Sequence, residues 1–98
     1  MKIIVNGSGG FAGLSEHYEV DTRNCLPPQE RSVTRLLEET RFFDESVPSA
    51  QEAVGADFMR WEITVIDDGR ERSVRFADDG GGVALRWKPI VDRVRSLQ

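Results

Sequence analysis

The chain has 98 residues, the size of one domain, and we expect residues 1–98 to form a single unit. Hydrophobic residues make up 39% and charged residues 31%, a balance that excludes a disordered chain. The net charge is −4 and neither half of the chain is basic, which argues against a protein that binds nucleic acid.

The single cysteine, Cys25, excludes an internal disulfide and a zinc site made of cysteine pairs. The apolar N-terminal stretch, residues 1–5, is too short for the core of a signal peptide. No run approaches the roughly 20 apolar residues of a membrane span. We therefore expect a cytoplasmic protein without a membrane partner.

The N-terminal part of the chain predicts two strands. Residues 2–6 are mostly β-branched or apolar, which favours a strand. The glycine-rich segment 7–13 follows and predicts a loop. Residues 17–21 alternate around Tyr18 and Val20, a pattern typical of a half-buried strand.

A helix is expected from Pro28 to about Arg41, since proline suits the first position of a helix. Phe42 and Phe43 follow it and are expected to cap the core. Residues 44–56 contain proline, glycine and small polar residues, which predict a loop. The residues that recur at helical spacing are Val33, Leu36, Leu37 and Thr40.

The C-terminal part changes to a period of two and then back to a helical pattern. Asp68-Gly69 is a strong hairpin signal, and Val74 and Phe76 mark the returning strand. A second glycine-rich loop spans 78–82. Pro89 is expected to begin a helix after it, with Ile90, Val94 and Leu97 on one face. The first strand of the hairpin presents Met59, Trp61, Ile63 and Val65 on one face.

The order of these elements is strand, strand, helix, strand, strand, helix (β-β-α-β-β-α). Connections between consecutive strands are short, which favours antiparallel pairing. The predicted fold is therefore α+β, with a four-stranded antiparallel sheet and two helices packed on one face.

Gly7, Gly10 and Gly13 follow the first expected strand with the spacing G-x-x-G-x-x-G. Short-chain dehydrogenases use such glycines to bring the backbone close to a pyrophosphate at a helix N-terminus. A parallel strand would then require a crossover of about ten or more residues, usually a helix. Here the chain turns strand-like within a few residues of Gly13. A small nucleotide-binding or enzymatic module is the weaker alternative, and we expect no cofactor.

Other polar side chains give little support for catalysis or metal binding. His17 is the only histidine, and a zinc enzyme needs about three converging ligands. Asp78 and Asp79 lack the alternating acidic spacing of a calcium loop. Cys25 has only His17 as a possible base, with no surrounding motif. We expect neither a catalytic residue nor a bound metal.

Phe11 stands among small residues that cannot bury it locally. It either folds back onto the core, with glycines providing a turn of positive φ, or is presented as an aromatic anchor for a partner. The residues alone leave both interpretations open. Trp61 and Trp87 are expected in the core, because each lies within an apolar pattern.

The sequence resembles emfourin and its relatives, small bacterial protein inhibitors of thermolysin-like zinc metalloproteases such as protealysin. The resemblance spans nearly the whole chain, although segment 78–82 is more acidic and glycine-rich than we expect for that family. The motifs that carry it are the first strand with Ser8–Gly13 (SGGFAG), Asp21 with Leu26-Pro27, Phe42-Phe43, Asp57-Phe58, the hairpin, and Pro89-Ile90.

The resemblance implies a protein that is not an enzyme and whose partner is a thermolysin-like (protealysin-type) protease. It implies competitive, non-covalent inhibition in which loops fill the substrate cleft. Such proteases are expected to favour a bulky apolar side chain, which Phe11 or Leu14 would supply. A structural adaptor without a protease target is the remaining alternative. The residues expected to bind the protease are Ser8, Gly9, Gly10, Phe11, Ala12, Gly13, Leu14, Asp78 and Asp79.

Overall fold

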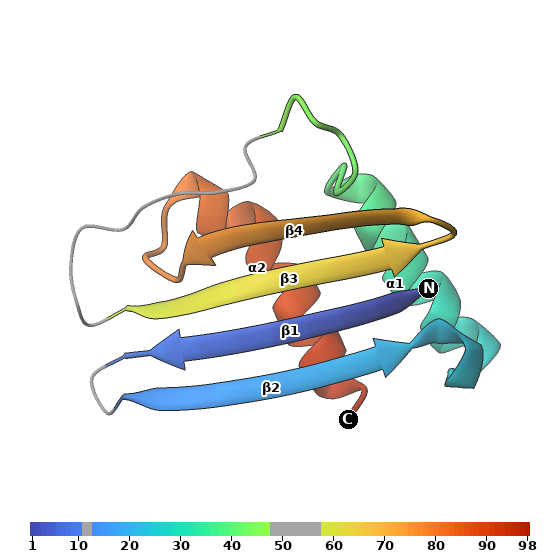
Figure 1. Cartoon of the computed structure of the whole chain (residues 1–98), viewed down its shortest axis with the longest axis horizontal. Helices are drawn as coiled ribbons and strands as arrows, with labels where there is room; N and C mark the ends of the chain where they lie inside the picture. Colours follow the sequence, from blue (N-terminus) through green and yellow to red (C-terminus); the bar gives the residue numbers. More distant parts are fainter. Residues whose placement is uncertain (11–12, 48–57) are drawn as a thin grey trace.

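The computed structural model describes residues 1–10, 13–47 and 58–98. The strands form one antiparallel sheet in the order β2-β1-β3-β4, and both helices cover the same face of it (Figure 1). The predicted α+β fold is confirmed. The elements are β1 (Lys2–Gly9), β2 (Leu14–Asp21), the short 3-10 helix η1 (Thr22–Asn24), α1 (Pro27–Glu39), β3 (Met59–Asp67), β4 (Arg70–Ala77) and α2 (Gly82–Ser96).

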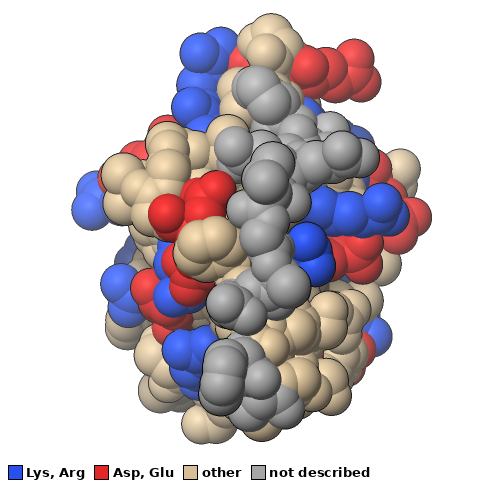
Figure 2. All heavy atoms as spheres, turned by 90° about the vertical axis from the view of Figure 1, so that its left-hand side faces the viewer, with Lys and Arg blue, Asp and Glu red and all other residues tan. Residues whose placement is uncertain are grey.

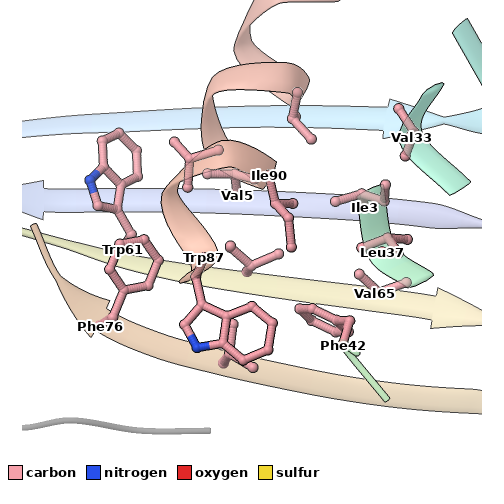
Figure 3. Close-up of a cluster of buried hydrophobic side chains, with 14 of the residues drawn as sticks. Ile3, Val5, Val33, Leu37, Phe42, Trp61, Val65, Phe76, Trp87 and Ile90 are labelled. Atoms are coloured by element: carbon pink, nitrogen blue, oxygen red, sulfur yellow. The ribbon is translucent and has the colours of Figure 1, made fainter. Parts of the chain in front are cut away.

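The core lies between the sheet and the two helices (Figure 3). Alternate residues of the central strands point into it, because side chains of a strand alternate between its two faces. Trp61 and Trp87 are 3% and 0% exposed, so the expectation that both tryptophans are core residues is confirmed. The fully buried residues of the central strands are Ile3, Val5, Ile63 and Val65.

α1 begins at Pro27 and ends at Glu39, so Arg41 lies beyond the helix instead of in its last turn. The N–H of Phe42 donates to the carbonyl of Leu37 at 3.0 Å, and Arg41 has a positive φ of 56°. This is a Schellman-type helix end, which also brings apolar residues on either side of the turn together. It directs Phe42 into the core, where its ring meets Trp87 edge-on at 5.6 Å.

The prediction that the last helix begins at Pro89 is wrong. α2 begins at Gly82, and Pro89 lies inside it. Proline removes one helical hydrogen bond, the one to the carbonyl of Leu85, and Leu85 is 70% exposed, so water can replace that partner. Burial of one continuous helix face outweighs the cost. The buried face consists of Ala84, Trp87, Ile90, Val91 and Val94.

The first two strands are longer than expected, because β1 continues into the glycine-rich segment as far as Gly9 and β2 already begins at Leu14. Ser8 pairs with Ser15, and Gly9 pairs with Leu14. The predicted turn at Asp68-Gly69 is confirmed, since both residues have positive φ, 47° and 83°, as a type I′ hairpin requires.

The face of the sheet opposite the helices carries mainly polar side chains. One row crosses all four strands through His17, Asn6, Glu62 and Arg75. Arg75 Nε donates to Glu62 at 2.6 Å, and His17 Nδ1 lies 2.5 Å from the Asn6 side-chain oxygen. Because these groups partner one another, this face is stable in contact with water.

Candidate functional site

Both segments expected to bind a protease lie at one end of the sheet (Figure 1). Gly9 pairs with Met59 at the start of β3, and the N–H of Asp78 donates to the carbonyl of Met59 at 2.9 Å. We call this region the loop end. It comprises the described residues Ser8–Gly10, Gly13–Leu14, Phe58–Met59 and Asp78–Gly81.

The turn between β1 and β2 depends on glycine for its backbone. Gly9, Gly10 and Gly13 have φ values of 99°, 76° and 63°. Residues other than glycine rarely adopt these positive backbone angles. The N–H of Gly13 donates to the carbonyl of Gly10 at 3.2 Å and closes the turn. Phe11 and Ala12, both expected contact residues, lie outside the described residues.

Two apolar side chains are exposed at the loop end. Leu14, an expected contact residue, is 59% exposed at the start of β2. Phe58 is 37% exposed just before β3, and a Cβ on Gly9 would lie 3.2 Å from its carbonyl oxygen. Phe58 was not among the residues predicted to bind a protease. Its proximity to the β1–β2 turn follows only from the pairing of β1 with β3.

Figure 2 views the molecule from the loop end. Basic and acidic side chains are interspersed there among uncharged ones, with no large area of a single sign on the visible described surface. A partner bound at this end would therefore be recognised by shape and apolar contact more than by net charge.

Asp78 and Asp79 both have partners within the chain. Asp79 accepts a hydrogen bond from the N–H of Gly81 at 2.8 Å and so shapes the approach to α2. Asp78 lies 3.4 Å from the ammonium of Lys88, which also lies 3.3 Å from Asp92. The structure thus brings these two acids to the loop end and gives them structural contacts there.

The glycine spacing that suggested a dinucleotide loop has a different physical cause. A Cβ on Gly7 would lie 2.4 Å from the ring of Trp61, so Gly7 makes room for a core side chain. The antiparallel strand β2 follows Gly13, and a dinucleotide site needs a helix N-terminus there. The nucleotide-binding alternative therefore lacks its central element.

His17 and Cys25 each have separate partners. His17 contacts Asn6 and lies 3.5 Å from Glu19 on the open face of the sheet. The sulfur of Cys25 lies 3.6 Å from the carbonyl oxygen of Asp21. Within residues 1–10, 13–47 and 58–98, no three histidine, cysteine or acidic side chains gather as metal ligands would.

Neither α1 nor α2 is long and apolar enough to cross a membrane. Comparisons with curated proteins and with solved structures find no match. A comparison with family models matches the family described as Emfourin over residues 5–87, from β1 into α2. Since this match covers most of the chain, the chain belongs to the emfourin family.

Proposed function

We propose that this protein is a competitive inhibitor of a thermolysin-like zinc metalloprotease and that its loop end enters the substrate cleft. Membership in the emfourin family carries the proposal, because it points to an inhibitor of metalloproteases and not to an enzyme. The thermolysin-like target, the competitive mechanism and the contact residues are the parts that we add.

The exposed apolar side chains at the loop end support this mode of binding. Leu14 presents a bulky side chain that is 59% exposed, which suits the apolar pocket expected in a thermolysin-like protease. Phe58 adds a second apolar group nearby. A standard interface takes about 800 Å² from each partner, and the total accessible surface here is 6065 Å². The loop end therefore needs to supply roughly one-eighth of the surface.

The rigid attachment of the turn also supports the proposal. β1 pairs along its length with β2 and β3, so both strands that lead to the turn are held in the sheet. Strands that are already paired in the sheet before binding have less entropy to lose in the complex. At Gly9, Gly10 and Gly13 the backbone carries no side chain, which permits its close approach to the walls of a cleft.

The direct experiment is to titrate the purified protein against several thermolysin-like proteases with a peptide substrate. We expect an apparent KM that rises with inhibitor concentration while kcat stays constant. A serine protease serves as the control and should keep its activity. No loss of metalloprotease activity at micromolar protein would overturn the proposal, and a fall in kcat at constant KM would overturn the competitive mechanism.

A further inference from the structure

On the face of the sheet that the helices cover, a row of paired residues lies next to the loop end, on the side away from the β1–β2 turn. Gly7 pairs with Glu16 of β2 on one side and with Trp61 of β3 on the other. Since Gly7 has no side chain, the Trp61 ring lies directly over the backbone of β1. The base of the β1–β2 hairpin is therefore held by side chains from its neighbours.

Arg95, in the last turn of α2, reaches this row. Its guanidinium carbon lies 5.3 Å from the centre of the Trp61 ring and 5.6 Å from that of Tyr18. One of its nitrogens lies 3.5 Å from Glu16, whose other carboxylate oxygen accepts a hydrogen bond from the Tyr18 hydroxyl at 2.9 Å. Arg95 thus connects β2 with β3 across the bare position at Gly7.

We propose that Arg95 is a positioning residue that holds the β1–β2 hairpin in its protease-binding geometry. Cation–π contact favours the position over Trp61 and Tyr18, and the ion pair with Glu16 adds attraction on the side of β2. The inference rests on the proposed function. Its physical basis is preorganisation, because a hairpin fixed at its base loses less entropy when it binds.

Other basic residues of α2 make different contacts. Arg86 donates to the carbonyl of Thr40, and Lys88 pairs with Asp78 and Asp92. Arg93 lines a surface groove beside α1, and among the described residues its side chain makes no hydrogen bond, ion pair or ring contact with the hairpin. Arg93 stands two positions from Arg95 in the same turn, so Arg93→Ala is a matched control with the same change of charge.

The test combines hydrogen exchange with inhibition for Arg95→Ala, Arg95→Lys and Arg93→Ala. In Arg95→Ala we expect faster exchange of the amides in residues 7–9 and 14–16, unchanged exchange at the β3–β4 turn, and inhibition weaker by roughly threefold or more. Arg95→Lys should recover part of both effects, since lysine keeps the cation. Arg93→Ala should change neither.

Two results would overturn the inference. Weaker inhibition with wild-type exchange in the hairpin would make Arg95 a direct protease contact, and no change in either measurement would leave it without a positioning role. Glu16→Gln replaces Arg95→Ala if that variant fails to fold, and its effect should be smaller and in the same direction. Hydrogen exchange is measured without a protease. The effect of Arg95 on the β1–β2 hairpin therefore remains testable even if no metalloprotease is inhibited and the proposed function fails.

Discussion

The two hairpin turns of the sheet lie at opposite ends (Figure 1). They differ in how far nearby apolar side chains are covered by the rest of the chain. At the β3–β4 turn, Arg70 pairs with Asp67 at 3.0 Å and covers the ring of Phe43 at 4.2 Å. At the loop end, Leu14 and Phe58 remain exposed. An apolar side chain already covered within the chain offers little to a partner, so Phe43 is a poorer anchor than Leu14. Exposure alone does not separate the two ends, because Ile66 near the β3–β4 turn is 39% exposed.

The largest effect is expected from alanine at Gly7, compared with alanine at Gly69 in the opposite turn. The new Cβ at Gly7 would lie 2.4 Å from the Trp61 ring, and overpacking a core typically costs about 1–3 kcal/mol. Gly69 has open space around it and a φ of 83°, so alanine there should cost about 1 kcal/mol through backbone strain alone.

Urea unfolding of the two glycine variants measures this difference. Gly7→Ala should also weaken inhibition, because it disturbs the β1–β2 hairpin beside the loop end. Gly69→Ala should inhibit as strongly as the wild type. Equal losses of stability would show that the Trp61 ring moves aside at little cost.

The next effect concerns Leu14 and a matched leucine on the opposite side of the molecule. Leu14 and Leu26 are 59% and 66% exposed, so serine at either position should change the free energy of unfolding little. Leu14→Ser should weaken inhibition by about 1–2 kcal/mol, as loss of an interface anchor does. Leu26→Ser should leave the inhibition constant unchanged. Equal inhibition by both variants would show that Leu14 is not part of the protease-binding surface.

Phe11 provides a test of the two interpretations that the sequence left open. If Phe11 is an anchor, Phe11→Ala should weaken inhibition by about 1 kcal/mol or more while the melting temperature stays nearly constant. A large fall in melting temperature, measured by circular dichroism, would instead assign Phe11 to the core.

The smallest effect is a pH dependence at the end of β2 away from the loop end. Hydrogen bonds from the side chain and the backbone N–H of Arg23 hold the pKa of Asp21 well below its ordinary value of 3.8. The Ser46 hydroxyl and backbone N–H also lower the pKa of Asp44. A lowered pKa in the folded state gives stability that is complete above about pH 4 and is lost as the pH falls further.

Urea midpoints at pH 5 and pH 3 test this contribution. The wild type should lose more stability between these values than Asp21→Asn, because the amide cannot take up the proton. The difference should be small, since Asp21 and Arg23 pair at the surface. An equal loss in both proteins would show that the Asp21–Arg23 pair contributes nothing to acid sensitivity.

Much of the fold could be predicted because its signals are local. The alternation around Trp61 and Ile63 defined the buried face of β3, and Asp68-Gly69 defined its turn. The start of α2 could not be found in this way. Pro89 is a strong local signal for a helix start, but the burial of Ala84 and Trp87 extends the helix upstream of it.

The candidate site was predictable in part. Ser8–Leu14 and the Asp78-Asp79 pair were singled out from glycine content, acidity and family resemblance, and the structure places their described members at one end of the sheet. Phe58 and Arg95 were not among the residues predicted to bind a protease. The contacts that place them beside the β1–β2 hairpin come from residues far away along the chain.

The sequence by itself determined the types of the elements, the glycine-dependent turns and the family, since each depends on patterns within short stretches of chain. The tertiary structure alone decided which residues became neighbours. The strand order β2-β1-β3-β4 places Trp61 over Gly7 and brings Phe58 beside the β1–β2 turn. Side-chain packing across separate strands depends on the whole chain, and no local pattern encodes it.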